Sequence, residues 1–113
     1  MRSKINYLEA AQANEAVFRS ILRDMKANRS SRPMGGVIPE ALETEAPLED
    51  IFNMYSRGNR MGKFTICDFR VEGTEAIIEF EDIAFLSGGG AELIYKITEE
   101  GVRYAGPGAM IMS

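Results

Sequence analysis

The sequence contains no histidine and no tryptophan, and its only cysteine is Cys67. Without histidine, the chain cannot form a Ser-His-Asp or Cys-His nucleophile, an imidazole proton shuttle or a histidine-bound zinc site. One cysteine excludes an internal disulfide, a Cys-x-x-Cys redox pair and a thiolate metal cage. We therefore expect no metal and no cofactor, and the missing catalytic groups favour a non-catalytic role over an enzyme.

Long hydrophobic runs are also missing. No apolar stretch approaches the roughly 20 residues of a membrane-spanning helix, and the first residues lead into no apolar signal core. A length of 113 residues is typical of one domain. We expect a soluble, cytoplasmic protein with a single domain over residues 1–113.

The net charge of −4 is unevenly distributed along the chain. Residues 1–32 hold seven basic and three acidic side chains, whereas residues 33–113 hold six basic and fourteen acidic ones. Because phosphate contacts supply most nucleic-acid affinity, this acidic body makes nucleic acid an unfavourable partner. We expect the basic segment to lie across the acidic part of its own domain, and an RNA contact through it is the minor alternative.

Helical periodicity marks the first part of the chain. Four apolar residues follow the spacing of one helix face: Phe18, Ile21, Leu22 and Met25. They predict a long amphipathic helix over residues 4–28, loosened near Asn14. The composition of residues 29–46 indicates an irregular, solvated, acidic connector, with a partner-binding loop as the alternative. Pro47 and the apolar spacing after it predict a short helix over residues 47–57.

From Lys63 the hydrophobic period changes to two, which is typical of strands. Short connections that contain glycine indicate an antiparallel meander of four to five strands over residues 63–113. The expected strands are Phe64–Val71, Ala76–Leu86, Glu92–Thr98 and Val102–Ala105, with Ala109–Met112 as a continuation or a fifth strand. The predicted fold class is α+β, with the long and the short helix packed on this sheet.

This element order is similar to that of the cystatin-like and nuclear-transport-factor-2-like α+β folds, in which a curved sheet grips a long helix. The resemblance covers most of the chain and rests on architecture, not on a motif. Those groups include pocket enzymes, ligand binders, protease inhibitors and bacterial immunity proteins. The catalytic groups of their enzyme members have no counterpart in this sequence, and the fold alone implies no function.

The register of the first hairpin assigns side chains to the two faces of the sheet. Closure at Gly73–Thr74 predicts three pairs on the core face: Val71 with Ala76, Phe69 with Ile78, and Cys67 with Phe80. The second face then carries six apolar residues among its charges: Phe64, Ile66, Ile77, Ile83, Phe85 and Ile94. Either a bulge near Glu81–Asp82 switches the faces, or the second face is covered by the short helix, the connector or another subunit. We favour the covered or dimeric sheet.

Self-association is the leading functional expectation, with a second copy of the chain or another protein as the partner. The interface candidates are Ile77 and Ile94 on the second face, and Met110 and Met112 in the apolar C-terminal run. For the two methionines, a final strand packed on the core or the sheet edge is the alternative.

The acidic pair Asp68 and Glu79 is the first candidate ligand or ion site. The register places the two carboxylates opposite each other, where like charges are destabilising unless a shared proton or a bound cation compensates. A surface network neutralised by Arg70 and Lys96 is the alternative, and so is a register one residue away.

Two further pairs are candidates for ligand contacts. Arg57 and Arg60 flank the loop after the short helix, and such a basic loop is suited to a carboxylate or phosphate. Favourable contact with the end of that helix is the alternative. Tyr95 and Tyr104 lie on neighbouring strands and would line a small-ligand or enzymatic pocket between helix and sheet, unless they serve core packing.

Overall fold

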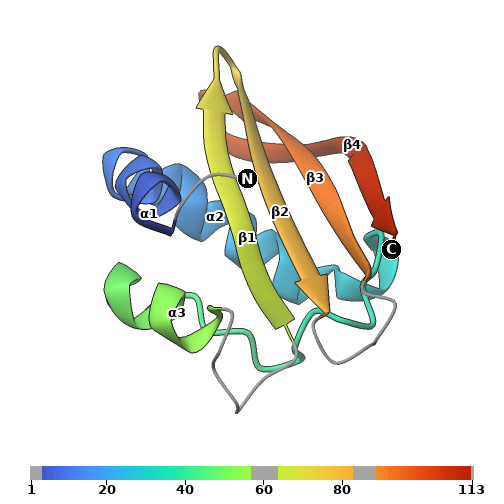
Figure 1. Cartoon of the computed structure of the whole chain (residues 1–113). Coiled ribbons are helices and arrows are strands. Elements are labelled where there is room, and N and C mark those ends of the chain that lie inside the picture. Colours follow the sequence, from blue (N-terminus) through green and yellow to red (C-terminus); the bar gives the residue numbers. More distant parts are fainter. Residues whose placement is uncertain (1–3, 57–63, 83–88, 113) are drawn as a thin grey trace.

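The computed structural model describes residues 4–56, 64–82 and 89–112. Within them, three α-helices pack on a four-stranded antiparallel sheet, which confirms the predicted α+β class. The helices are α1 (Lys4–Ala13), α2 (Glu15–Ala27) and α3 (Leu48–Met54), with a 3-10 turn at Arg29–Ser31. The strands are β1 (Phe64–Glu72), β2 (Glu75–Asp82), β3 (Gly89–Thr98) and β4 (Gly101–Met112), in the sheet order β1-β2-β3-β4. Figure 1 shows α2 running behind the sheet, α1 beside β1 at the left, and α3 below α1.

The predicted long helix is interrupted at Asn14. The backbone of this residue leaves the helical region, with φ −133° and ψ 48°, and its Nδ2 donates to the carbonyl of Ala10 at 3.0 Å. An asparagine side chain that bonds the preceding turn competes with the helical backbone, so α1 and α2 separate here. The residues that α2 buries are those of the predicted helix face: Phe18, Ile21, Leu22 and Met25.

The core lies between the helices and one face of the sheet. Phe18 of α2 stacks on Phe52 of α3 with 5.1 Å between the ring centroids, and it meets Phe69 of β1 edge-on at 5.0 Å. These three rings join both helices to the sheet, in geometries that aromatic pairs prefer. No helix in the described ranges is long and apolar enough to span a membrane.

The connector between α2 and α3 is irregular, but it is not the solvated segment that its composition predicts. Ile38 and Leu42 are fully buried in the core. The backbone N–H of Glu43 donates to the hydroxyl of Tyr55 at 2.8 Å, which ties the connector to the end of α3. The many acidic side chains of the connector predict a solvent-exposed segment. Two apolar side chains, Ile38 and Leu42, are nevertheless enough to anchor it on the core.

Basic side chains of α2 hold the connector from the other side. Arg19 Nη1 donates to the carbonyls of Thr44 and Ala46, each at 2.8 Å. Arg23 binds both carboxylate oxygens of Glu45, each at 2.9 Å. The basic segment therefore lies against the acidic part of its own domain, as the uneven charge distribution predicts.

The β1–β2 pairing follows the predicted register next to the turn and departs from it further along. Two predicted pairs are present: Val71 with Ala76, and Phe69 with Ile78. Cys67, however, is an extra residue in β1, so Ile66 lies opposite Phe80. The predicted pairing of Cys67 with Phe80 is wrong, because a β-bulge inserts one residue into one strand only.

The bulge moves the beginning of β1 to the other face of the sheet. Phe64 and Ile66, expected on the second face, are 3% and 1% exposed and belong to the core. The bulge lies at Cys67 and not near Glu81–Asp82. It explains part of the apolar excess that the sequence assigns to the second face, without a second layer to cover it.

The strand ends also differ from the expectation. The described part of β2 is Glu75–Asp82, and the expected continuation to Leu86 falls outside the described residues. Two apolar residues assigned to the second face consequently lie outside the described part of the chain: Ile83 and Phe85. β4 continues through Ala109–Met112, so the final segment extends the fourth strand and is not a fifth one.

Candidate functional site

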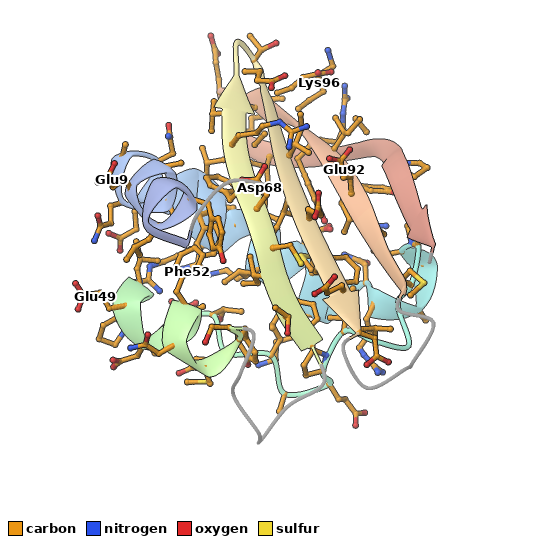
Figure 2. The ribbon with its side chains drawn as sticks, in the orientation of Figure 1. Glu9, Glu49, Phe52, Asp68, Glu92 and Lys96 are labelled. Carbon is orange, nitrogen blue, oxygen red and sulfur yellow. The ribbon has the colours of Figure 1, made fainter. Side chains whose placement is uncertain are left out.

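A row of carboxylates crosses the face of the sheet that points away from the helices, which we call the open face. Asp68 of β1 lies opposite Glu79 of β2, as the predicted register requires. Glu92 of β3 lies opposite Glu79 on its other side. These three residues from adjacent strands form the acidic row. Figure 2 shows Asp68 and Glu92 on the near face of the sheet, with the helices behind it.

Arg70 contacts both ends of the acidic row. Its Nη1 lies 2.9 Å from Asp68 Oδ2 and its Nη2 lies 3.4 Å from Glu92 Oε2, while Nε binds Glu72 at 3.0 Å. Burial opposes the charge of Arg70, but the hydrogen bonds to Asp68 and Glu72 outweigh it and raise the pKa of the guanidinium. The neutralising role expected for Arg70 is therefore present at Asp68 and Glu92.

Glu79, the central member of the row, is not neutralised in this way. Within the described residues, its carboxylate makes no hydrogen bond and no ion pair. Its pKa is raised because burial disfavours the charged form and because the charges of Glu92 and Asp68 repel it, an effect that Arg70 only partly offsets. A proton or a positive group at Glu79 would relieve this repulsion.

A buried hydroxyl borders the acidic row. Thr65 lies opposite Glu81 of β2, and its position before the bulge puts it on the open face with Asp68. The residue is 3% exposed, and its Oγ1 has no hydrogen-bond partner within the described part of the chain. A buried hydroxyl is normally paired, so this oxygen is an unsatisfied hydrogen-bond acceptor next to the row.

The acidic row does not have the geometry of a metal site. In residues 4–56, 64–82 and 89–112, no group of three or more acidic or sulfur side chains is placed to hold a metal ion. Calcium and magnesium need six or more oxygen ligands at short, regular distances. An ammonium or guanidinium group brings its own hydrogen-bond donors and needs only acceptors, so it suits the row better.

The isoleucine candidates lie next to the acidic row. Ile77 of β2 is directly opposite Ile94 of β3, on the open face. Ile77 is only 6% exposed and Ile94 is half-buried, since long charged side chains flank them. The structure thus brings the pair together as predicted, but it leaves little apolar surface for a partner.

Four other candidates cannot be placed. Arg57 and Arg60 lie outside the described residues. Met110 and Met112 belong to the backbone of β4, where they pair with Ala91 and Gly89, but their side chains are not described.

The tyrosine candidates belong to a hydrogen-bonded cluster at the edge of the core. Tyr95 is fully buried, and its hydroxyl donates to Asp24 Oδ2 at 2.5 Å. Arg32 binds both oxygens of Asp24 at 2.8 and 2.9 Å, and its guanidinium lies 4.0 Å from the centroid of the Tyr104 ring. The cluster joins α2, the connector, β3 and β4, so the Tyr95 hydroxyl holds the fold together and does not point into a pocket.

The protonation states of this cluster support a structural role. Burial opposes the ionisation of Asp24, but the hydrogen bonds from Arg32 and Tyr95 outweigh it and lower its pKa. Burial, together with the Asp24 carboxylate, raises the pKa of Tyr95, so the phenol keeps its proton. Neither group titrates near neutral pH, as acid–base catalysis would require.

Large side chains of the described residues are buried between the helices and the sheet. The largest fully buried ones are Tyr95, Phe18, Phe52, Phe69 and Phe80. A hollow of about 590 Å³ lies instead at the β3–β4 turn, open to solvent. It is lined by Thr98, Glu99, Glu100, Val102 and Arg103. This arrangement gives little support to the predicted alternative of a ligand pocket between helix and sheet.

Sequence reasoning found two members of the acidic row and missed Glu92 and the neighbouring Thr65. Glu92 belongs to the row because the β2–β3 register places it opposite Glu79. The expected strand Ala76–Leu86 implied a different register for this hairpin, so Glu92 was not predicted. The side on which Thr65 lies depends on the bulge at Cys67. The sequence did contain a signal for an acidic face: Glu79 and Glu81 are two positions apart, which puts both on the same face of one strand.

Comparisons of this chain with protein-family models, with curated proteins and with solved structures found no match. Its function is therefore inferred from the geometry and chemistry of the open face.

Proposed function

We propose that the chain is a non-catalytic protein-interaction domain that binds its partner through the open face of the sheet. The observation that carries this proposal is the one-sided packing of the fold. The described helices cover one face of the sheet, and the other presents the acidic row beside Ile77 and Ile94. Like charges on adjacent strands destabilise the isolated domain, and a partner that supplies positive charge would offset that repulsion.

The partner is either another protein or a second copy of the chain. The half-buried Ile94 favours a homodimer, since a second copy would cover it. Charge opposes a homodimer, because two copies facing each other would bring two acidic rows into one interface. The open face therefore suits a different protein better than it suits itself.

The C-terminal strand is the less favourable interaction surface of the two that we expected. The pairing of β4 with β3 shifts register twice, Gly106 adopts a φ of 138°, and Pro107 has no backbone N–H. Bulges and proline at a sheet edge block the continuous hydrogen bonding that edge-to-edge pairing requires. We also propose a cytoplasmic location, where a buried cysteine outside any disulfide stays reduced.

Photo-crosslinking tests this proposal without knowledge of the partner. A photoreactive side chain replaces Lys96, which is exposed on the open face, and in a matched variant it replaces Glu9, which is exposed on α1 (Figure 2). In the native cells, we expect a discrete adduct from position 96 and none from position 9. An adduct of twice the chain mass identifies a homodimer, and any other mass identifies a different protein.

The outcome that contradicts the proposal is equally clear. If position 96 yields no discrete adduct, or if both positions yield the same products, the open face is not the interaction surface.

A further inference from the structure

The surroundings of Glu79 are acidic on three sides. Asp68 and Glu92 lie directly opposite it on the neighbouring strands, and Glu81 follows it on the same face of β2. Side chains directly opposite each other have their Cβ atoms about 4.5–5.5 Å apart, so these charges act on Glu79 at short range. Among the described residues, the nearby guanidinium is that of Arg70, which is bound to Asp68, Glu72 and Glu92.

A second and independent feature is the buried hydroxyl of Thr65. It lies opposite Glu81 and next to Asp68 on the open face, and its Oγ1 has no hydrogen-bond partner among the described residues. A hydroxyl oxygen can accept a hydrogen bond from a cationic donor, although an ionised carboxylate is the stronger acceptor. The site therefore combines a neutral acceptor, Thr65 Oγ1, with the Glu79 carboxylate, which makes no hydrogen bond to the described residues. This combination distinguishes it from a simple cluster of acidic side chains.

The neighbouring strand leaves room for this arrangement. A Cβ at Gly108 of β4 would come within 2.7 Å of Glu92 Oε1 and 2.9 Å of Glu92 Cβ. The glycine thus allows the Glu92 side chain to lie across β4, and any larger residue would displace it. The position of the Glu92 side chain therefore depends on the absence of a side chain at Gly108.

We propose that the acidic row binds a lysine or arginine side chain of a basic segment in a partner protein, with the cationic group placed over Glu79 between Asp68 and Glu92. This inference rests on the proposed function, because it names the chemistry of the partner at the same face. Charge complementarity selects this occupant: the row lacks the geometry for a metal ion, and a second copy of the chain presents the same negative charge.

The experiment measures the binding of a short oligolysine peptide to the full chain at low ionic strength, followed by amide chemical shifts in β1, β2 and β3. Glu79→Gln tests the site, and Glu49→Gln, which removes the same charge from exposed Glu49 on α3 (Figure 2), is the matched control. We expect Glu79→Gln to weaken binding about fivefold and Glu49→Gln to change it less than about twofold. An oligomer of acetyl-lysine should not bind.

Three results would overturn the inference. The first is no binding of oligolysine to the unmodified chain, and the second is an equal loss in both variants, which indicates only general charge attraction. The third is that spermidine binds the row as tightly as oligolysine does, which indicates a free amine as the occupant. Gln matches Glu in shape, and coincident urea-unfolding transitions by two probes verify that each variant is folded.

The two proposals fail separately. A crosslink from position 96 without oligolysine binding keeps the interaction function and rejects the basic segment. Oligolysine binding to the acidic row without any crosslink rejects the interaction function, and with it the partner assigned here.

Discussion

The hydroxyl of Tyr95 on β3 donates a hydrogen bond to the carboxylate of Asp24 on α2, across 71 positions of the chain. The same carboxylate accepts hydrogen bonds from Arg32 and Asn28. A partly buried carboxylate is stabilised when its oxygens are paired, and here the donors come from three parts of the chain. The contact fixes the position of α2 on the sheet, and it explains why Tyr95 is not a ligand-binding group.

Removal of this hydroxyl should destabilise the fold. We expect Tyr95→Phe to lower the free energy of unfolding by about 1–2 kcal/mol, because the partly buried Asp24 carboxylate loses one of its donors. Urea-induced unfolding measures the change. Tyr104→Phe is the control: the Tyr104 hydroxyl makes no hydrogen bond to the described residues, and the ring under Arg32 stays in place. The control should change stability by less than about 0.5 kcal/mol, and equal losses in the two variants would contradict the role given to the Tyr95–Asp24 bond.

Arg19 should matter more than Arg23, although both lie on α2. Arg19 is 15% exposed in its side chain and binds two connector carbonyls, whereas Arg23 is 52% exposed and forms a surface ion pair. We expect Arg19→Met to lower the free energy of unfolding by about 1–3 kcal/mol, because it leaves carbonyl groups without donors. Arg23→Met should lower it by less than about 1 kcal/mol. Thermal or urea unfolding of the two variants measures both changes. A larger loss of stability in Arg23→Met would show that the Arg23–Glu45 ion pair, and not the Arg19 hydrogen bonds, holds the connector.

Gly35 in the connector should not tolerate a side chain. A Cβ at this position would lie 1.6 Å from the carbonyl oxygen of Arg29, whereas a Cβ at Gly36 meets nothing within 4 Å. We expect Gly35→Ala to lower the free energy of unfolding by about 2 kcal/mol or more, since the backbone must shift. Gly36→Ala should stay within about 0.5 kcal/mol of the unmodified chain. If chemical denaturation finds the two variants equally stable, the tight turn between Arg29 and Gly35 is not maintained in solution.

Glu79→Gln should stabilise the domain at neutral pH. The variant removes repulsion from Asp68 and Glu92, and we expect a gain of a few tenths to about 1 kcal/mol. The pKa of Glu79 is raised in the fold above the ordinary value of 4.5. The folded state therefore holds this proton more tightly than the unfolded state, and stability declines as the pH rises from 4.5 through the raised pKa.

The pH profile of unfolding tests the same prediction independently. Below pH 4.5, Glu79 is protonated in both states, so Glu79→Gln and the unmodified chain should differ little. The difference should grow as the pH rises to 7. A difference that is constant from acid to neutral pH would indicate that Glu79 is not repelled by the row.

The features that depend on residues close together in the sequence were predictable. The spacing of Phe18, Ile21, Leu22 and Met25 determined the buried face of α2, since helical periodicity is a local property. The turn at Gly73–Thr74 determined that Asp68 lies opposite Glu79, because a short hairpin fixes the register of its strands. The α+β class and two of the three members of the acidic row, Asp68 and Glu79, followed from these local rules.

The tertiary structure alone decided the remainder. The bulge at Cys67 turns Phe64 and Ile66 into the core, since burying two large apolar side chains outweighs one unpaired strand position. The closure of the second hairpin places Glu92 beside Glu79, and the packing of Ile38 and Leu42 draws an acidic connector onto the core. Such contacts join segments far apart in the chain, and their energy depends on which surfaces meet, which no local pattern of residues specifies.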